Sequence, residues 1–172
     1  GADDNASGIA SIIEIGRNLA GRRDALGRSI IIVAFDGEES GLIGSTHFVE
    51  DSTVSPERIK LMFSLDMLGM YGAHGGVDLL GVKQLIDHER LTGELAAEHG
   101  LLVKKANPRV DLLTDTAPFG NVGIPAVHVF TGTESPYHKP EDDAELLDYE
   151  GMALIADYLS DAVLQLSAAE KL

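Results

Sequence analysis

One segment constrains the fold more than any other: a continuous apolar run at positions 29–35, with the sequence SIIIVAF. An uninterrupted run of β-branched residues is typical of a strand that is covered on both faces, as strands are in a parallel sheet. The run stops at Asp36-Gly37, a pair that favours a turn. We therefore predict that residues 29–35 form a buried strand of a parallel sheet.

Helical patterns flank this run on both sides. Apolar residues at helical spacing predict a helix over 9–20, with Asp4-Asn5 as N-cap candidates, and a closing helix over 152–166. Further strands are predicted at 59–68, 77–82 and 124–130, further helices near 39–48 and over 84–99, and a turn-rich stretch at 51–56. This alternation, with 44% hydrophobic residues, predicts a single α/β domain over 1–172 with a mainly parallel sheet flanked by helices.

The composition narrows the possible partners. The chain has 28 acidic and 13 basic residues, a formal charge of -15, so we expect it to bind neither nucleic acid nor anionic membranes. No apolar run approaches the roughly 18 to 20 residues that span a bilayer, so we expect no membrane insertion. The chain has no cysteine, so any metal must be held by His, Asp and Glu. It starts at Gly1 rather than Met, as a processed product would, which favours a secreted or periplasmic location over a cytoplasmic one.

Three acidic clusters lie at predicted strand ends or in the adjoining loops: Asp3-Asp4, the segment 36–39, and Asp66. Functional groups gather beyond the carboxyl ends of strands in an open α/β sheet, so these clusters could converge. An isolated acidic pair is more often a solvated cap or turn. Asp66 differs, because it lies between apolar residues, where a carboxylate needs a partner.

A fourth segment, residues 135–143, places Tyr137 and His138 in a proline-bounded loop after a predicted strand. Imidazole with several carboxylates is a ligand set that suits zinc or a similar divalent ion. In the adjacent pair Glu38-Glu39, one carboxylate could bind a metal while the other transfers protons to and from a metal-bound water. None of these signals is specific alone.

Taken in order, the segments resemble the signatures of the co-catalytic-zinc aminopeptidases, a superfamily that also includes glutaminyl cyclases and transferrin-receptor-like ectodomains. The matching motifs are GADDNASG at 1–8, FDGEESGLIGS at 35–45, LDMLG at 65–69, DTAPF at 115–119, GIP at 123–125, and Tyr137-His138. The resemblance implies a zinc-exopeptidase (phosphorylase/hydrolase-like) fold and a zinc-dependent metallopeptidase that removes N-terminal residues from a peptide substrate.

The resemblance also implies roles for individual residues. Asp4 would bridge two zinc ions, with Asp3 only its neighbour. Glu39 and His138 would bind one zinc, and Asp66 the other.

Two further residues would carry the chemistry. Glu38 would act as general base for attack of a metal-bound hydroxide on the peptide carbonyl, and Tyr137 would donate a hydrogen bond to the tetrahedral intermediate.

The sequence departs from the family pattern at one place. The family has a His-x-Asp motif on a strand upstream of the bridging aspartate, and here only Gly1-Ala2-Asp3 precede Asp4. We therefore expect a catalytic domain that is incomplete at its N-terminus and binds one zinc tightly or none, instead of the family's two. A complementing upstream segment, or another chain, would supply the missing strand and cover an unpaired sheet edge.

Two alternatives stay open. A glutaminyl cyclase would use a single zinc held by Asp, Glu and His, the set that is retained here. A metal-free binding domain of the same fold would have no need for Glu38-Glu39 and Tyr137-His138. A replacement ligand is not evident from the sequence: His128 lies in an apolar strand and is expected to be a satisfied core residue, and His88-Glu89 lacks the second histidine of a zincin.

Overall fold

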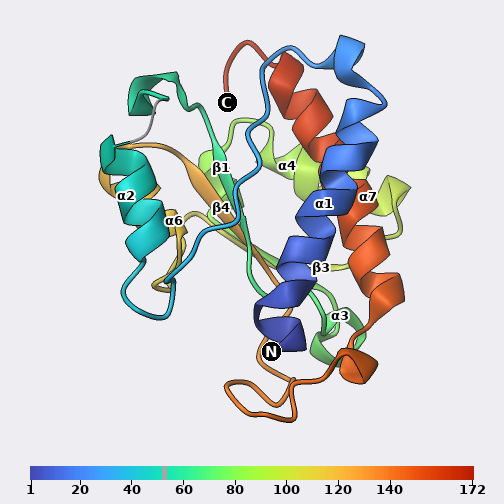
Figure 1. Ribbon diagram of the computed structural model, residues 1–172. Helices are drawn as coiled ribbons and strands as arrows, with labels where there is room; N and C mark the ends of the chain where they lie inside the picture. Colours follow the sequence, from blue (N-terminus) through green and yellow to red (C-terminus); the bar gives the residue numbers. More distant parts are fainter. Residues whose placement is uncertain (52–53) are drawn as a thin grey trace.

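A computed structural model describes residues 1–51 and 54–172 of the chain (Figure 1). Residues 52–53 of the predicted turn at 51–56 lie outside the described residues. One four-stranded sheet lies at the centre, with the strand order β1-β4-β2-β3. Its strands are β1 (Met62–Leu65), β2 (Val77–Leu80), β3 (Val103–Asn107) and β4 (Ala126–Phe130).

The sheet is mixed and mainly parallel, as predicted. β1 runs parallel to β4, with Met62 opposite Ala126, and β2 runs parallel to β3. β2 and β4 pair in antiparallel fashion, with Leu79 opposite Val129. β3 forms one edge of the sheet, and its Lys104 and Lys105 side chains are exposed. Strand edges that carry lysine resist pairing with another chain.

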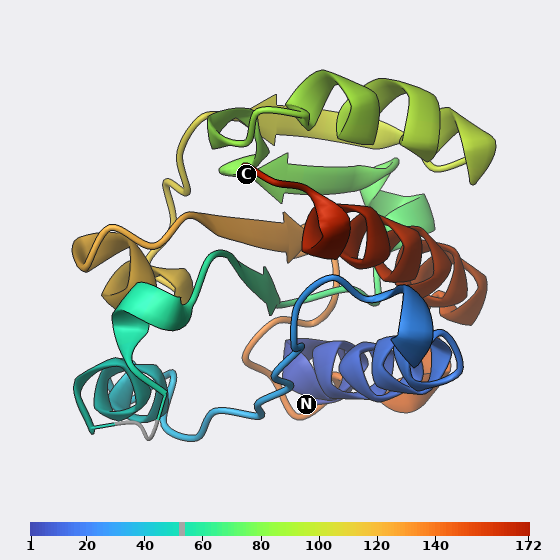
Figure 2. The same cartoon turned by 90° about the horizontal axis from the view of Figure 1, so that it is seen from above.

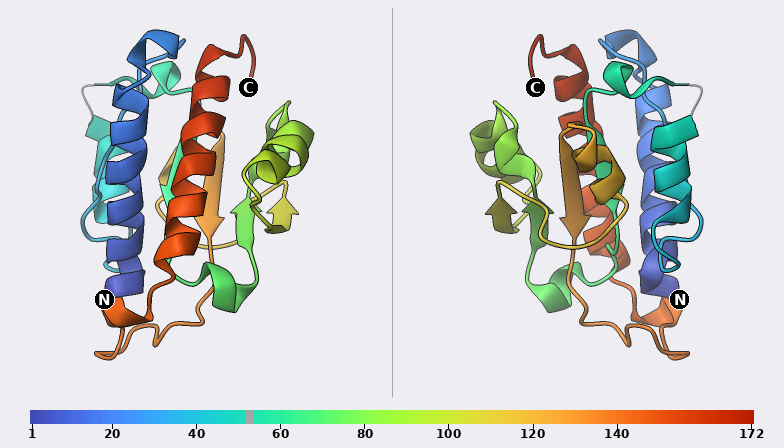
Figure 3. Two further views of the ribbon diagram at one scale, coloured as in Figure 1. Left: turned by 90° about the vertical axis from the view of Figure 1, so that its right-hand side faces the viewer. Right: turned by 90° about the vertical axis from the view of Figure 1, so that its left-hand side faces the viewer.

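Helices cover both faces of the sheet. α1 (Gly8–Ala20) and α7 (Tyr149–Ala168) pack against each other on one face, whereas α2 (Ile43–Asp51) and α6 (Thr116–Asn121) pack together on the other. Figure 3 shows this layering, since α7 lies in front of β4 in one view and α6 lies in front of it in the opposite view. The helices predicted at both ends of the chain are therefore confirmed.

The remaining helical segments are short. They are η1 (Ala2–Ser7), η2 (Arg23–Ala25), η3 (Pro56–Arg58), α3 (Tyr71–His74), η4 (Val82–Gln84), α4 (His88–Arg90), η5 (Leu91–Leu95), α5 (Ala96–Glu98) and η6 (Ala144–Leu146). α4, η5 and α5 follow one another and correspond to the helix predicted over 84–99. Among the described residues, no helix combines the length and apolar character that crossing a bilayer requires.

The main core lies between α1, α7 and the sheet. Val127 and Val129 of β4 are fully buried there, together with Ile155 and Leu159 of α7. His128 lies between the two valines, so its side chain points to the opposite face of the sheet. Side chains of α1 and α7 meet the core at helical spacing, which explains why periodicity located both helices.

The strand predicted at 29–35 is not formed. Within the described part of the chain these residues have no strand partner, and the side chains of Ile30, Ile31 and Ile32 are 37%, 51% and 48% exposed. In Figure 2 their trace runs beyond β1, on the side of that strand away from β4. The run has the composition of a buried strand, but a strand requires a neighbour with which to exchange hydrogen bonds.

Candidate metal centre

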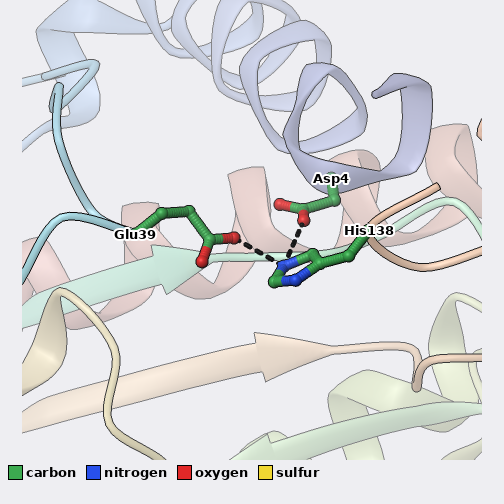
Figure 4. Close-up of side chains that lie close together, drawn as sticks. All are labelled: Asp4, Glu39 and His138. Atoms are coloured by element: carbon green, nitrogen blue, oxygen red, sulfur yellow. Dashed lines mark hydrogen bonds and ion pairs between the residues drawn. The ribbon is translucent and has the colours of Figure 1, made fainter. Parts of the chain in front are cut away.

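Three predicted ligands come together at one point. His138 Nε2 lies 2.7 Å from Glu39 Oε1 and 3.2 Å from Asp4 Oδ2 (Figure 4). One donor atom from each of the three residues lies within 4.8 Å of the other two. The three residues are 35 and 99 positions apart along the chain, so only the fold brings them together.

Local backbone geometry presents each of the three side chains. Asp4 lies in η1, just before α1. Glu39 lies in a tight turn before α2, where Gly37 adopts a positive φ of 70° and the Leu42 N–H donates to the Glu38 carbonyl at 2.9 Å. His138 follows β4 in the loop predicted to carry it and adopts φ 57°, a left-handed conformation that is rare for a residue with a side chain.

The three groups fit a zinc ion. Ligands of a tetrahedral zinc at roughly 2.0 to 2.2 Å stand about 3.4 Å apart, close to the separations found here. The side chains of Glu39 and His138 are 59% and 47% exposed, so small rotations can adjust their spacing. One imidazole with two carboxylates is a donor set that zinc accepts in proteins.

Asp66 lies near these ligands but outside their group. It follows β1 directly, and its N–H donates to the Val129 carbonyl at 3.2 Å. Burial, and after it the charges of four acidic neighbours, raise the pKa of Asp66 to about 7; the neighbours are Asp4, Glu38, Asp115 and Glu39. The half-buried carboxylate of Asp66 therefore lies in the negative field of other carboxylates, a field that a bound cation would neutralise.

The predicted general base, Glu38, stands in the same electrostatic field. Burial raises the pKa of Glu38, and the carboxylates of Glu39, Asp115 and Asp4 add to the effect. The pKa of Asp4 is also raised, first by burial and then by Glu39, while His138 acts in the opposite direction. A carboxylate with a raised pKa can both accept and return a proton near neutral pH.

Tyr137 lies beside His138. Its ring stacks on that of His138, with centroids 3.8 Å apart and planes inclined by 29°. The Tyr137 side chain is 41% exposed, and its partial burial and the nearby carboxylates raise its pKa, so the hydroxyl stays a proton donor at neutral pH.

Two further aspartates lie at the site, and no role was predicted for either from the sequence. Asp115 precedes α6 and contributes to the raised pKa values of both Glu38 and Asp66. Asp142 is buried and accepts backbone hydrogen bonds from Asp3 and Asp4. Asp115 lies in a motif already matched to the family, which was a usable signal. Asp142 lies in an acidic run that resembles an exposed loop.

The expectation for His128 is half wrong. The side chain is fully buried, as predicted, but neither ring nitrogen has a hydrogen-bond partner among the residues that the structure describes. Burial lowers the pKa of His128 to about 4, so the ring is neutral at physiological pH.

Comparison with known proteins identifies the family of the chain. Residues 1–163 match the sequence profile described as Peptidase family M28. The chain belongs to Peptidase family M28. The family resemblance that the motifs indicated is therefore confirmed.

Relatives and solved structures place this M28 chain among larger proteins. It is 28% identical over 183 residues to the aminopeptidase YwaD of Bacillus subtilis, a match that covers 99% of this chain and 39% of the relative. The structure of the LapA aminopeptidase of Legionella pneumophila aligns with a TM-score of 0.78 at 24% identity, covering 98% of this chain and 48% of that one. A glutaminyl cyclase of Porphyromonas gingivalis aligns at 0.71 with 19% identity, covering 96% and 63%. These alignments confirm the predicted fold, and the M28 chain spans less than two thirds of each of the three proteins.

Proposed function

We propose that this chain forms the main part of the catalytic domain of a zinc-dependent aminopeptidase. The convergence of Asp4, Glu39 and His138 within 4.8 Å carries the proposal, because one imidazole and two carboxylates at this spacing form a donor set that suits zinc. Family membership and the name of the Bacillus relative support peptide hydrolysis as the reaction.

We assign the roles as the family resemblance implies them, and the placement of the residues supports this assignment. Zinc, when bound, would supply a Lewis acid that polarises the scissile carbonyl and lowers the pKa of a coordinated water. Glu38 takes a proton from the attacking water and returns it to the leaving amine, a task that its raised pKa suits. The Tyr137 hydroxyl donates a hydrogen bond to the developing oxyanion.

The site favours a substrate with a free N-terminus. The site carries an excess of negative charge from five carboxylates that raise one another's pKa values: Asp4, Glu38, Glu39, Asp66 and Asp115. A cationic α-amino group is attracted to such a field, whereas a peptide carboxylate is repelled. This charge balance supports an aminopeptidase over a carboxypeptidase.

We also propose that the chain alone binds one zinc tightly and hydrolyses peptides poorly. The described residues contain one group of three potential ligands, and Asp66 stands outside it without an imidazole partner. The run at 29–35 has no strand partner in the described chain and exposes its three isoleucines. This supports the addition of a complementing strand, from the same protein or another chain, that brings the second zinc's histidine.

The experiment is a zinc titration of the chain, with hydrolysis of an aminoacyl chromogenic substrate measured with and without the upstream segment of the parent protein. We expect one tight zinc and low turnover alone, and two zinc ions and higher turnover with the segment. Two tight zinc ions and full turnover without any added segment would contradict the truncated-site proposal. A chain that binds no zinc would favour the metal-free binding domain.

A glutaminyl cyclase is the second candidate, because the observed group of one Asp, one Glu and one His matches the single-zinc set that the sequence resemblance assigns to those enzymes. A peptide with N-terminal glutamine distinguishes the two reactions. Cyclisation releases ammonia and leaves the chain length unchanged, whereas aminopeptidase action releases free glutamine.

A further inference from the structure

Two aspartates outside the predicted ligand set lie buried behind Asp4. Asp3 is completely buried, and Asp142 is 6% exposed. We infer that Asp142, assisted by Asp3, is a positioning residue that ties the backbones of the ligand-bearing segments to one another. This inference rests on the zinc site proposed above and explains how its ligands are held in place.

Asp142 joins the Asp4 segment to the His138 loop. Its Oδ1 and Oδ2 both accept the Asp3 N–H at 3.1 Å, and Oδ2 also accepts the Asp4 N–H at 3.1 Å. Its own carbonyl accepts the Ala2 N–H at 2.9 Å. Asp142 comes four residues after His138 in the same loop, so one side chain fixes two of the three ligand segments relative to each other.

Asp3 extends the linkage to the segment after β1. Its Oδ1 accepts the Gly69 N–H at 2.7 Å, three residues beyond Asp66. Ser7 reinforces this connection, since its hydroxyl donates to the Asp3 carbonyl at 2.7 Å and accepts the Leu68 N–H at 3.0 Å. The segments that carry Asp4, Asp66 and His138 thus share one buried network of hydrogen bonds.

General stabilisation of the fold is an insufficient reason for this arrangement. Burying a carboxylate is unfavourable unless hydrogen bonds compensate for the lost hydration, and apolar side chains would fill the same space without that cost. Here the compensating donors are the backbone N–H groups of the ligand segments themselves. Partners of this kind orient metal ligands in other proteins, and their loss typically weakens metal binding by about 10- to 100-fold.

The two aspartates should respond differently to replacement by asparagine. Asp142 uses both oxygens as acceptors, so in D142N an amide N–H group would face a backbone N–H donor. Asp3 accepts the Gly69 N–H through Oδ1, and its Oδ2 has no hydrogen-bond partner among the described residues. In D3N the amide oxygen can take the place of Oδ1, so the hydrogen bond from Gly69 is kept.

Two matched controls separate positioning from charge and from stability. Asp143 is the exposed neighbour of Asp142, and the described chain shows no hydrogen bond to its side chain, so D143N removes the same charge from nearly the same place. Asp148 accepts two backbone N–H groups, from Gly72 at 2.8 Å and Gly151 at 2.9 Å, at the start of α7. D148N therefore breaks the same kind of linkage away from the ligands.

The test measures zinc affinity of the chain by competition with a chromogenic chelator, together with thermal unfolding without metal. We expect D142N to lose about 10-fold in zinc affinity or more, and D3N to lose less than D142N. The controls D143N and D148N should stay within about threefold of wild type. Ser7→Ala, a milder change in the same network, should also weaken binding and serves if D142N does not fold. Wild-type zinc affinity in D142N, or in S7A if D142N does not fold, would overturn the inference, as would an equal loss in either control. Absence of zinc binding by the wild type would instead overturn the proposed site, and the inference with it.

Discussion

Several carboxylates crowd around the imidazole of His138, and each makes ionisation of the others less favourable. Asp66 shows the effect most clearly, with a pKa of about 7 that is raised first by burial and then by four acidic neighbours. A bound cation would relieve this repulsion, which is why such clusters occur at metal sites and at catalytic sites. The proton transfer proposed for Glu38 relies on the same crowding, which raises the pKa of Glu38.

We expect E38Q to lower peptide hydrolysis by about 10²- to 10⁴-fold in the complemented chain, because glutamine cannot accept the proton. Zinc affinity should stay nearly unchanged, since Glu38 lies outside the ligand group. Steady-state kinetics with zinc titration would check both. D36N is a suitable control, because it removes a carboxylate from the same turn. The Asp36 carboxylate accepts a hydrogen bond from the Gly37 N–H there. Unchanged turnover in E38Q would assign proton transfer to another group.

The buried His128 ring should make the stability of the chain depend on pH. Its pKa is about 4 in the folded chain and about 6.5 in the unfolded chain, so between these values the unfolded state binds more protons and stability falls as pH falls. At pH 5 this difference lowers the free energy of unfolding by about 2 kcal/mol. H128L should remove this loss, so the stability of H128L relative to wild type should rise by about 2 kcal/mol from pH 8 to pH 5 in urea titrations. A gap independent of pH would contradict the buried, neutral ring.

The sequence predicted the candidate ligands better than it predicted what holds them. Asp4, Glu39 and His138 were recognisable from motifs, and the structure brings them together. Asp142 was not singled out within the predicted loop at 135–143, because its burial depends on backbone donors 138 and 139 positions earlier. No local pattern reveals such a partner.

Among the elements, the run at 29–35 shows the limit of composition as a guide. Apolar strands at 77–80 and 126–130 were predicted correctly, since each finds neighbours in the sheet. The run at 29–35 has a stronger strand composition but finds no partner in the described chain. Strand formation is decided by pairing, which lies outside the reach of local sequence.

The exposed run predicts self-association. Ile31 is 51% exposed within it, and apolar extended segments without partners readily pair with other chains. We expect I31K to reduce self-association in sedimentation velocity without loss of thermal stability. Ile86 is 61% exposed elsewhere on the surface, so I86K adds the same charge as a control and should change little. Equal effects of the two substitutions would mean that net charge, and not the run, governs association.

For the whole molecule, the ligand group connects parts of the chain that only folding brings together. Zinc should therefore bind the folded state and stabilise it, by about 2.7 kcal/mol at 100 times its dissociation constant. We expect a rise of about 5 to 10 °C in the unfolding midpoint with zinc, measured by calorimetry. H138A should abolish the rise. H47A should retain it, because His47 is exposed and pairs with Asp51 on α2. A rise that persists in H138A would place the ion elsewhere.

The two borders of the sheet differ in a way that limits how large assemblies can grow. Beyond β1 lies the apolar run at 29–35, whereas β3 at the opposite border presents Lys104 and Lys105. A molecule that can associate through the apolar run, but resists pairing along β3, forms one contact with a second copy. No edge that favours further association is then left exposed. A fibril needs two associating edges on every subunit. Concentrated solutions of this chain should therefore contain dimers and no filaments.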